Sequence, residues 1–252
     1  MSQKVAYVTG GMGGIGTAIC QRLHKDGFKV IAGCGPSRDH AKWIDEQKAL
    51  GYTFYASVGN VSDWDSTVEA FKKTKAEHGP VDVLVNNAGI TKDGMFRKMS
   101  KSDWDSVIDT NLNSLFNVTK QVIDDMVDRG WGRIVNIASV AGMRAVGSGR
   151  TAYGTSKGAV IALTRQMAVE LAEHGITANA VAPGPVDTPM TQVLHTEAFR
   201  QEYSKAIPMN RYGTTAEIAA AVMYLVSEDA AYTSGIAMPV DGGFLASGAR
   251  GL

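Results

Sequence analysis

Seven short runs rich in β-branched residues alternate with longer segments of helical periodicity along almost the whole chain. Strands separated by helices are typical of βαβ units, in which parallel strands are joined by right-handed crossovers. The strand-like runs cover 5–9, 29–33, 53–57, 81–86, 133–138, 177–182 and 236–240. Helical patterns fall at about 14–26, 38–50, 63–78, 101–129, 151–174 and 214–228. The alternation predicts a single doubly wound α/β domain over 1–252, with a seven-stranded, mostly parallel sheet and helices on both faces.

The longest segment without either periodicity runs from about 183 to 213. Long irregular segments in compact domains are usually functional, and many act as lids. We therefore expect a substrate lid at about 189–212. Its apolar side chains would line a pocket or pack against the body of the protein: Met190, Val193, Leu194 and Phe199.

Charge and composition exclude several classes of protein. Lys plus Arg and Asp plus Glu number 25 each, so no net field draws the chain to nucleic acid or to an anionic membrane. The five histidines are scattered, and Cys20 and Cys34 form no C-x-x-C motif, so no metal site is expected. No apolar run reaches the roughly 18 residues that span a bilayer. The N-terminus shows no signal peptide, which favours a cytoplasmic protein.

The first strand leads into T-G-G-M-G-G-I-G, residues 9–16, which opens the first helix. Glycines suit a turn that brings backbone close to a pyrophosphate, and the helix N-terminus attracts its negative charge. In this position the stretch predicts the dinucleotide-binding turn of a Rossmann fold, although a merely flexible loop would have the same composition.

The end of the second strand bears on the choice of cofactor. NAD-binding versions of this fold carry an acid there for the ribose 2′-hydroxyl, but the position near Cys34 is not acidic. Ser37 and Arg38 follow, and guanidinium groups bind phosphate well, so NADPH is favoured and NADH stays possible. Asp39 complicates this reading, because the three residues together would also simply cap the next helix.

Tyr153 and Lys157 stand one helical turn apart among small residues. At this spacing two side chains share a helix face, with Cβ atoms about 5–6 Å apart. A nearby cation favours the phenolate, so we expect Lys157 to lower the pKa of Tyr153 below its usual value of about 10. The alternative is an ordinary pair on a solvated helix face.

Six motifs together resemble the short-chain dehydrogenase/reductase family over essentially the whole chain. They are Thr9-Gly10-x-x-x-Gly14-x-Gly16, Asn86-Asn87-Ala88-Gly89, Asn111, Ser139, Tyr153-x-x-x-Lys157 and Pro183-Gly184-x-x-x-Thr188. The resemblance implies a nicotinamide-dependent oxidoreductase in which Tyr153 is the general acid or base. Ser139 would donate to the reacting oxygen, Lys157 would bind the nicotinamide ribose, and Asn111 would hold a water of a proton relay.

Each of these partners also has a purely structural alternative. Ser139 would cap a turn, Asn111 would bond backbone inside a helix, and Thr188 would cap the segment that follows. The resemblance also implies cofactor contacts by Tyr153 and Lys157, and by Gly10, Gly14, Ile15, Gly16, Ser37, Arg38, Asn60, Val61, Asn87, Ala88, Gly89, Pro183, Gly184, Val186 and Thr188. Asn60 stands where the family usually has Asp.

The substrate is less well defined than the reaction. The first half most resembles the family's acetoacetyl-CoA reductases of polyhydroxybutyrate synthesis, whereas the second half is similar to generic members. We therefore expect NAD(P)H-dependent reduction of a 3-oxoacyl-CoA. The alternatives are a ketone, polyol or sugar dehydrogenase, a 3-oxoacyl carrier-protein reductase, and a nucleotide-sensing regulator that lost the chemistry.

Four loop cations are candidates for the phosphates of a CoA ester, although each would equally suit a solvated surface: Arg97, Lys98, Arg144 and Arg150. The resemblance further implies a homotetramer built through the helical segments 101–129 and 151–174 and the last strand. Those segments carry apolar residues on more than one face, which would equally suit core helices.

Overall fold

Seven parallel strands form the central sheet of the computed structural model, which describes residues 3–247. Their order, β3-β2-β1-β4-β5-β6-β9, reverses direction between β1 and β4, as in doubly wound folds. The strands are β1 (Val5–Val8), β2 (Lys29–Cys34), β3 (Phe54–Val58), β4 (Val83–Asn86), β5 (Gly132–Ile137), β6 (Ile176–Pro183) and β9 (Ala237–Val240). The predicted fold class and all seven predicted strands are confirmed, and every pairing in this sheet is parallel.

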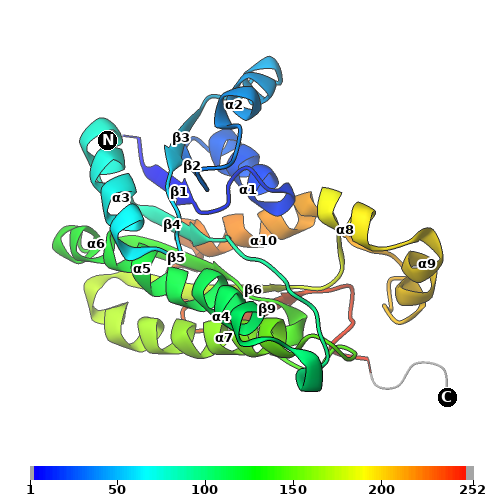
Figure 1. The fold of residues 1–252 in the computed structure, drawn as a ribbon. Helices are drawn as coiled ribbons and strands as arrows, with labels where there is room; N and C mark the ends of the chain where they lie inside the picture. Colours follow the sequence, from blue (N-terminus) through cyan, green and yellow to red (C-terminus); the bar gives the residue numbers. More distant parts are fainter. Residues whose placement is uncertain (1–2, 248–252) are drawn as a thin grey trace.

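Helices cover both faces of the sheet (Figure 1). One layer holds α1, α2 and α10, and the other holds α3 to α7. The helices are α1 (Gly14–Lys25), α2 (His40–Ala49), α3 (Trp64–His78), α4 (Lys101–Ile108), α5 (Ser114–Lys120), α6 (Ile123–Arg129), α7 (Thr151–Leu171), α8 (Pro189–Leu194), α9 (Glu197–Lys205) and α10 (Thr215–Val226).

Burial on both faces explains why the strands read as continuous apolar runs. In β1, Ala6 and Val8 point into the core beneath α1 and α10, while Val5 and Tyr7 point into the core on the opposite face. Successive strand residues alternate between faces, so a strand covered on both sides needs apolar residues at every position.

The helix predicted over 101–129 is wrong in one respect, because the chain is broken there into α4, α5 and α6. A π-helical segment, η2 (Asp109–Asn113), separates α4 from α5 and carries the fully buried Asn111. A single π turn shifts the register of the side chains that follow it and is frequent at functional sites. Apolar periodicity alone cannot reveal such a turn.

The segment predicted to be irregular holds two helices and a short pairing. The strands β7 (Val186–Asp187) and β8 (Gly213–Thr214) pair in parallel. This pair, which we call the neck, brings together the two ends of the segment 189–212. Thr188 and Thr196 cap the helices α8 and α9 within it. We call residues 189–212 the α8–α9 segment; it projects beside the carboxyl edge of the sheet (Figure 1).

Candidate active site

A cavity of about 880 Å³ opens where the central strands end. Its wall is formed by residues that directly follow β1, β2, β4, β5 and β6, together with the start of α7 and part of the α8–α9 segment. Open α/β sheets bind ligands at the carboxyl ends of their strands, where the strand order reverses. The cavity therefore occupies the expected place for a dinucleotide and a substrate.

The glycine turn after β1 forms one end of this cavity. Gly10 has a φ of 60°, which favours glycine, and a Cβ on Gly16 would overlap the carbonyl oxygen of Gly10. The N-cap of α1, Gly13, makes no side-chain capping bond, so the first N–H groups of the helix stay available to an anion. Gly14, Ile15 and Gly16 all line the cavity, as the dinucleotide hypothesis requires.

The residues after β4 hold the glycine turn in place. The Asn87 side-chain amide donates to the carbonyl oxygens of Thr9, at 2.9 Å, and Gly10, at 3.1 Å. The Thr9 hydroxyl accepts from the backbone N–H groups of Asn87, at 2.9 Å, and Ala88, at 3.0 Å. Asn87, Ala88 and Gly89 line the cavity, so their expected place beside the cofactor agrees with the geometry.

The loop after β2 separates the three residues that bear on cofactor choice. The Arg38 guanidinium lines the cavity and donates to the carbonyl oxygen of Met12 at 2.9 Å. The Asp39 carboxylate accepts from the Lys42 N–H at 3.0 Å and so caps α2. Ser37 is exposed and does not line the cavity. Of the three, Arg38 alone is placed to meet a ligand in this cavity.

Asn60 and Val61 lie in the turn after β3 and do not line the cavity. The Asn60 side chain accepts from the Ser62 N–H at 3.2 Å, and the Val61 carbonyl oxygen accepts from the Asn117 amide at 3.0 Å. These bonds stabilise the turn itself. The structure thus does not bring this predicted pair to the cavity wall.

Ser139, Tyr153 and Lys157 meet at the centre of the cavity wall. Ser139 follows β5 and is 8% exposed, while Tyr153 and Lys157 occupy consecutive turns of α7. The Ser139 hydroxyl accepts from the Ala141 N–H at 3.1 Å, and it is close enough to the Tyr153 hydroxyl to lower the pKa of that phenol. Ser139 therefore caps a 3-10 turn, η3 (Val140–Gly142), and contacts the tyrosine at the same time.

The pKa values of the pair differ from the expectation that Lys157 lowers that of Tyr153. Burial raises the pKa of Tyr153 and outweighs the lowering by the Ser139 hydrogen bond and by the positive charge of Arg150. Burial also lowers the pKa of Lys157 to about 8, and its Nζ donates to the Ile137 carbonyl oxygen at 2.8 Å. The phenol is therefore protonated at neutral pH, which is the form that a general acid needs.

Asn111 reaches the same region from η2. Its Oδ1 accepts from the Ile90 N–H at 2.8 Å, and its Nδ2 donates to the Ile90 carbonyl oxygen at 2.9 Å and to the Ser156 hydroxyl at 3.1 Å. A Cβ on Gly89 would lie 3.3 Å from Asn111 Oδ1 and 3.4 Å from Lys157 Nζ. Asn111 thus binds backbone, as the structural alternative held, and approaches Lys157 next to the cavity wall.

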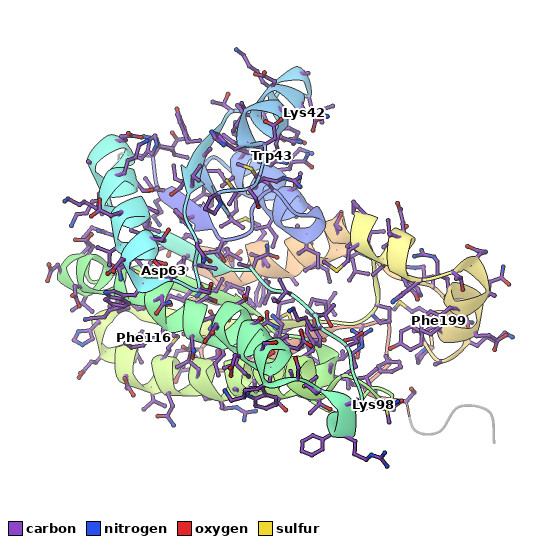
Figure 2. The ribbon with its side chains drawn as sticks, in the orientation of Figure 1. Lys42, Trp43, Asp63, Lys98, Phe116 and Phe199 are labelled. Carbon is purple, nitrogen blue, oxygen red and sulfur yellow. The ribbon has the colours of Figure 1, made fainter. Side chains whose placement is uncertain are left out.

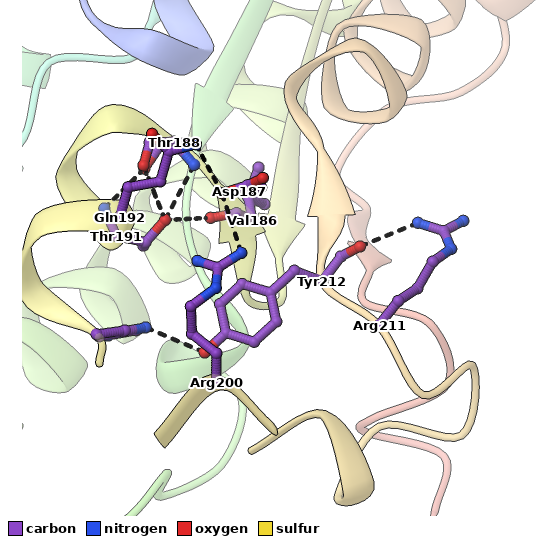
Figure 3. Close-up of polar contacts among 9 residues, drawn as sticks. Val186, Asp187, Thr188, Thr191, Gln192, Arg200, Arg211 and Tyr212 are labelled. Atoms are coloured by element: carbon purple, nitrogen blue, oxygen red, sulfur yellow. Dashed lines mark hydrogen bonds and ion pairs between the residues drawn. The ribbon is translucent and has the colours of Figure 1, made fainter. Parts of the chain in front are cut away.

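The chain after β6 completes the wall. Pro183, Gly184, Val186 and Thr188 all line the cavity. The Thr188 hydroxyl accepts from the Thr191 N–H at 3.2 Å, and the Thr191 hydroxyl accepts from the Thr188 N–H at 2.9 Å, which is a capping box (Figure 3). Thr188 therefore caps α8 and contacts the cavity, so its structural role leaves a role in binding open.

Polar contacts fasten the α8–α9 segment to its neck (Figure 3). Arg200 on α9 pairs with Asp187 of β7 at 3.1 Å, and its guanidinium lies 4.4 Å from the ring centroid of Tyr212. The Tyr212 hydroxyl lies 3.0 Å from His195 Nδ1, and His195 lines the cavity. The segment is thus held by side chains from both of its ends.

The substrate end of the cavity contains residues that no sequence motif indicated: Asp93, Val146, His195 and Tyr203. They lie on loops and on the α8–α9 segment; of the four, only Tyr203 had a signal in the sequence, because it stands one helical turn after Phe199. Met190 and Phe199 line the cavity as expected, and Figure 2 shows Phe199 on α9. Val193 is 85% exposed and does not, and the side chain of Leu194 lies outside the described part of the structure.

The fold and the cavity are those of a nucleotide-dependent oxidoreductase. Residues 4–198 match the family model described as short chain dehydrogenase, and the chain belongs to the short-chain dehydrogenase/reductase family. Members transfer a hydride between a nicotinamide cofactor and an alcohol or carbonyl carbon. Within the described residues, no helix is long and apolar enough to cross a membrane, and no cluster of three potential metal ligands occurs.

Three relatives indicate the range of substrates among similar proteins. An acetoacetyl-CoA reductase of Cupriavidus necator is 55% identical over 244 residues, which is 96% of this chain and 98% of that one. A 3-oxoacyl-acyl-carrier-protein reductase of Thermotoga maritima is 39% identical over 96% of this chain and 98% of that one. The structure of a gluconate 5-dehydrogenase from Burkholderia cenocepacia with NADP and tartrate is 29% identical, with a TM-score of 0.92 over 98% of this chain and 97% of that one.

Proposed function

We propose that the chain reduces the 3-oxo group of a 3-oxoacyl-CoA, with acetoacetyl-CoA giving 3-hydroxybutyryl-CoA as the reference reaction. The observation that carries the proposal is the grouping of Ser139, Tyr153 and Lys157 in the wall of a cavity that also contains the glycine turn. The similarity to the acetoacetyl-CoA reductase of Cupriavidus necator supports the substrate class. Such a product would supply polyhydroxybutyrate synthesis.

Each residue of the site is proposed to have a separate role in the reduction. The bound cofactor supplies the hydride. The hydroxyl groups of Tyr153 and Ser139 both donate to the carbonyl oxygen of the substrate, which polarises it. As negative charge develops there, Tyr153 gives its proton to that oxygen, and the Lys157 ammonium stabilises the phenolate that remains. The Asn111 side chain approaches Lys157 and is proposed to hold the water that returns the proton.

The cavity fits a nicotinamide dinucleotide, and we propose NADPH as the preferred form. The glycine turn and the N-terminus of α1 would hold the pyrophosphate, Lys157 the nicotinamide ribose, and Val186 and Thr188 the nicotinamide. Arg38 would bind the ribose 2′-phosphate, because its guanidinium lies in the cavity wall while Asp39 is occupied as the cap of α2. An Arg38→Gln variant should lose most of its preference for NADPH over NADH.

The α8–α9 segment is proposed as the substrate lid, and the active form as a cytoplasmic homotetramer. Phe116 on α5, labelled in Figure 2, is 59% exposed and stacks on Trp64. Val169 on α7 is 79% exposed. Apolar side chains exposed on these helices would be buried against a second copy of the chain. Light scattering on the purified protein would test this assembly, and a monomer would contradict it.

Turnover of acetoacetyl-CoA, with NADPH and NADH in parallel, tests the proposed reaction. Rapid loss of reduced nicotinamide absorbance supports the acyl-CoA substrate, and the ratio of kcat/KM values tests the role of Arg38. The comparison substrates are the carrier-protein ester, assayed in the same way, and gluconate, assayed in the oxidative direction with NADP⁺ or NAD⁺ by the gain of the same absorbance. If either is turned over efficiently while acetoacetyl-CoA is not, the acyl-CoA proposal is wrong.

A further inference from the structure

The four loop cations considered for an acyl-CoA substrate have different surroundings in the structure. Arg97 and Lys98 lie exposed on η1 (Phe96–Lys98), where Figure 2 shows Lys98 at the outer tip of its loop. The Arg144 guanidinium lies 5.0 Å from the ring centroid of Phe244 and outside the cavity wall. Arg150 is the one member of this set that lines the cavity.

Arg150 is held next to the reacting position. It is the N-cap residue of α7, and its guanidinium lies 5.8 Å from the ring centroid of Tyr153. Its Nε lies 3.3 Å from a carboxylate oxygen of Asp93, which also lines the cavity. The Gly94 N–H donates to the Gly149 carbonyl oxygen at 2.8 Å, which joins the loops that carry the two charged residues. The pair is thus fixed at the substrate end of the cavity.

The chemistry of this pair suits a neutral oxygen better than a phosphate. Among the described residues, Arg150 has Asp93 as its ionic partner and no side-chain hydrogen bond, so its Nη groups remain available as donors. A phosphate dianion at this point would be repelled by the Asp93 carboxylate, whereas a carbonyl oxygen carries no net charge and is repelled far less. The phosphates of a CoA ester are moreover separated from the thioester by the whole pantetheine arm, so they cannot reach the side of Tyr153.

We propose that Arg150 is a specificity-determining residue that donates to the thioester or ester carbonyl of a 3-oxo substrate while Tyr153 and Ser139 hold the 3-oxo oxygen. The inference rests on the proposed function for its substrate class. One methylene separates the two carbonyl carbons of such a substrate, so donors on either side of this short span select a 1,3-dicarbonyl over a 1,4-dicarbonyl compound.

An Arg150→Gln variant tests this role, with Arg97→Gln as a matched control on the neighbouring loop. The Arg150 side chain makes no capping bond to α7, so the substitution should leave the helix intact, and thermal melting would verify this. The readout is the ratio of kcat/KM for methyl acetoacetate to that for methyl levulinate. We expect a preference for the first that falls on the order of tenfold in Arg150→Gln and is unchanged in Arg97→Gln.

A second pair of substrates separates recognition of the carbonyl from recognition of phosphate. S-acetoacetyl-N-acetylcysteamine carries the same thioester as acetoacetyl-CoA without the phosphates. Equal losses of kcat/KM on the two thioesters support the proposal, and a loss confined to the CoA ester overturns it. An equal loss on all four substrates, with a shifted pH profile, would also overturn it, because Arg150 would then act through the pKa of Tyr153.

The wild-type protein separates this proposal from the proposed function. Failure of the wild type on acetoacetyl-CoA, beside a preference for methyl acetoacetate that Arg150→Gln abolishes, would reject the acyl-CoA substrate and keep the role of Arg150. An unchanged preference in Arg150→Gln, beside rapid turnover of acetoacetyl-CoA by the wild type, would do the reverse.

Discussion

The two ends of the cavity differ in whether backbone or side chains form their walls. The cofactor end is mostly backbone: a Cβ at Gly10 or Gly16 would crowd its neighbours, and Asn87 holds the glycine turn through the carbonyl oxygens of Thr9 and Gly10. The substrate end is side chains on loops and on the α8–α9 segment, held by the ion pairs Asp93–Arg150 and Asp187–Arg200. A change at the first end disturbs the fold, whereas a change at the second alters one contact at a time. The same fold can therefore keep its cofactor-binding site while its substrate specificity changes.

The largest effect is expected at Tyr153, where the two ends meet. Tyr153→Phe removes the proton donor and leaves the ring, so kcat should fall by about 10³-fold or more while the cofactor still binds. Steady-state kinetics and cofactor titration by fluorescence would measure the two quantities. Tyr232→Phe, at a fully exposed tyrosine, is the control. Normal turnover by Tyr153→Phe would refute the catalytic assignment and revive the nucleotide-sensing alternative.

The next largest effect concerns the backbone end. In Gly16→Ala the new methyl group overlaps the Gly10 carbonyl oxygen, so the turn must move and lose charge-assisted bonds to the pyrophosphate. We expect the cofactor Kd to rise by about tenfold to a hundredfold, measured by calorimetry. Gly35→Ala is the comparison at the same end of the cavity, because a Cβ there meets nothing within 4 Å. Equal affinities in the two variants would show that the turn tolerates a side chain at Gly16.

Lys157 should produce opposite pH trends in activity and stability. Burial lowers its pKa from 10.5 to about 8, so between these values the folded state binds fewer protons than the unfolded state. The free energy of unfolding should therefore rise across this window, by up to about 3 kcal/mol, while activity that needs the ammonium falls. Chemical denaturation of the wild type and of Lys157→Met would show the rise in the first alone. Parallel slopes in both proteins would contradict the lowered pKa of Lys157.

The smallest effect is expected from the fastening of the α8–α9 segment. Arg200→Gln should raise the substrate KM about fivefold and leave the cofactor Kd unchanged, since the Asp187–Arg200 pair is only partly buried. Combining it with Asp187→Asn in a double-mutant cycle would show whether the two changes act through one contact. Glu202→Gln, which removes an exposed ion pair on the same helix, should alter neither constant. Fully additive effects would mean that the pair does not hold the segment.

The fold was predictable because its signals are local. Strands buried on both faces must be apolar throughout, and the glycine turn follows β1 within a few residues. The π segment around Asn111 was not predictable, because it depends on where Ile90 and Ser156 lie in three dimensions. The helices α8 and α9 were missed because they are short: with 6 and 9 residues, they hold too few apolar positions for a helical period to stand out.

The positions of the site residues were predictable where a motif fixes the course of the backbone. The pKa values were less predictable, because they depend on burial. Ser139, Tyr153 and Lys157 line one cavity, in agreement with the resemblance, yet the pKa of Tyr153 moves upward because desolvation outweighs the charges around it. Ser37, Asn60 and Val61 stand off the cavity wall, since strand ends alone do not fix the course of a turn. No motif marks Asp93 as a residue of the site. Its place there depends on the ion pair with Arg150, which stands 57 positions further along the chain.

The pairing of β7 with β8 brings the start and the end of the α8–α9 segment to one point at the edge of the molecule. An insert whose two ends already touch can be lengthened, shortened or exchanged without displacing what it is attached to. This segment is therefore a replaceable part: grafting the corresponding stretch of another member between Asp187 and Gly213 offers a direct way to give this scaffold a new substrate.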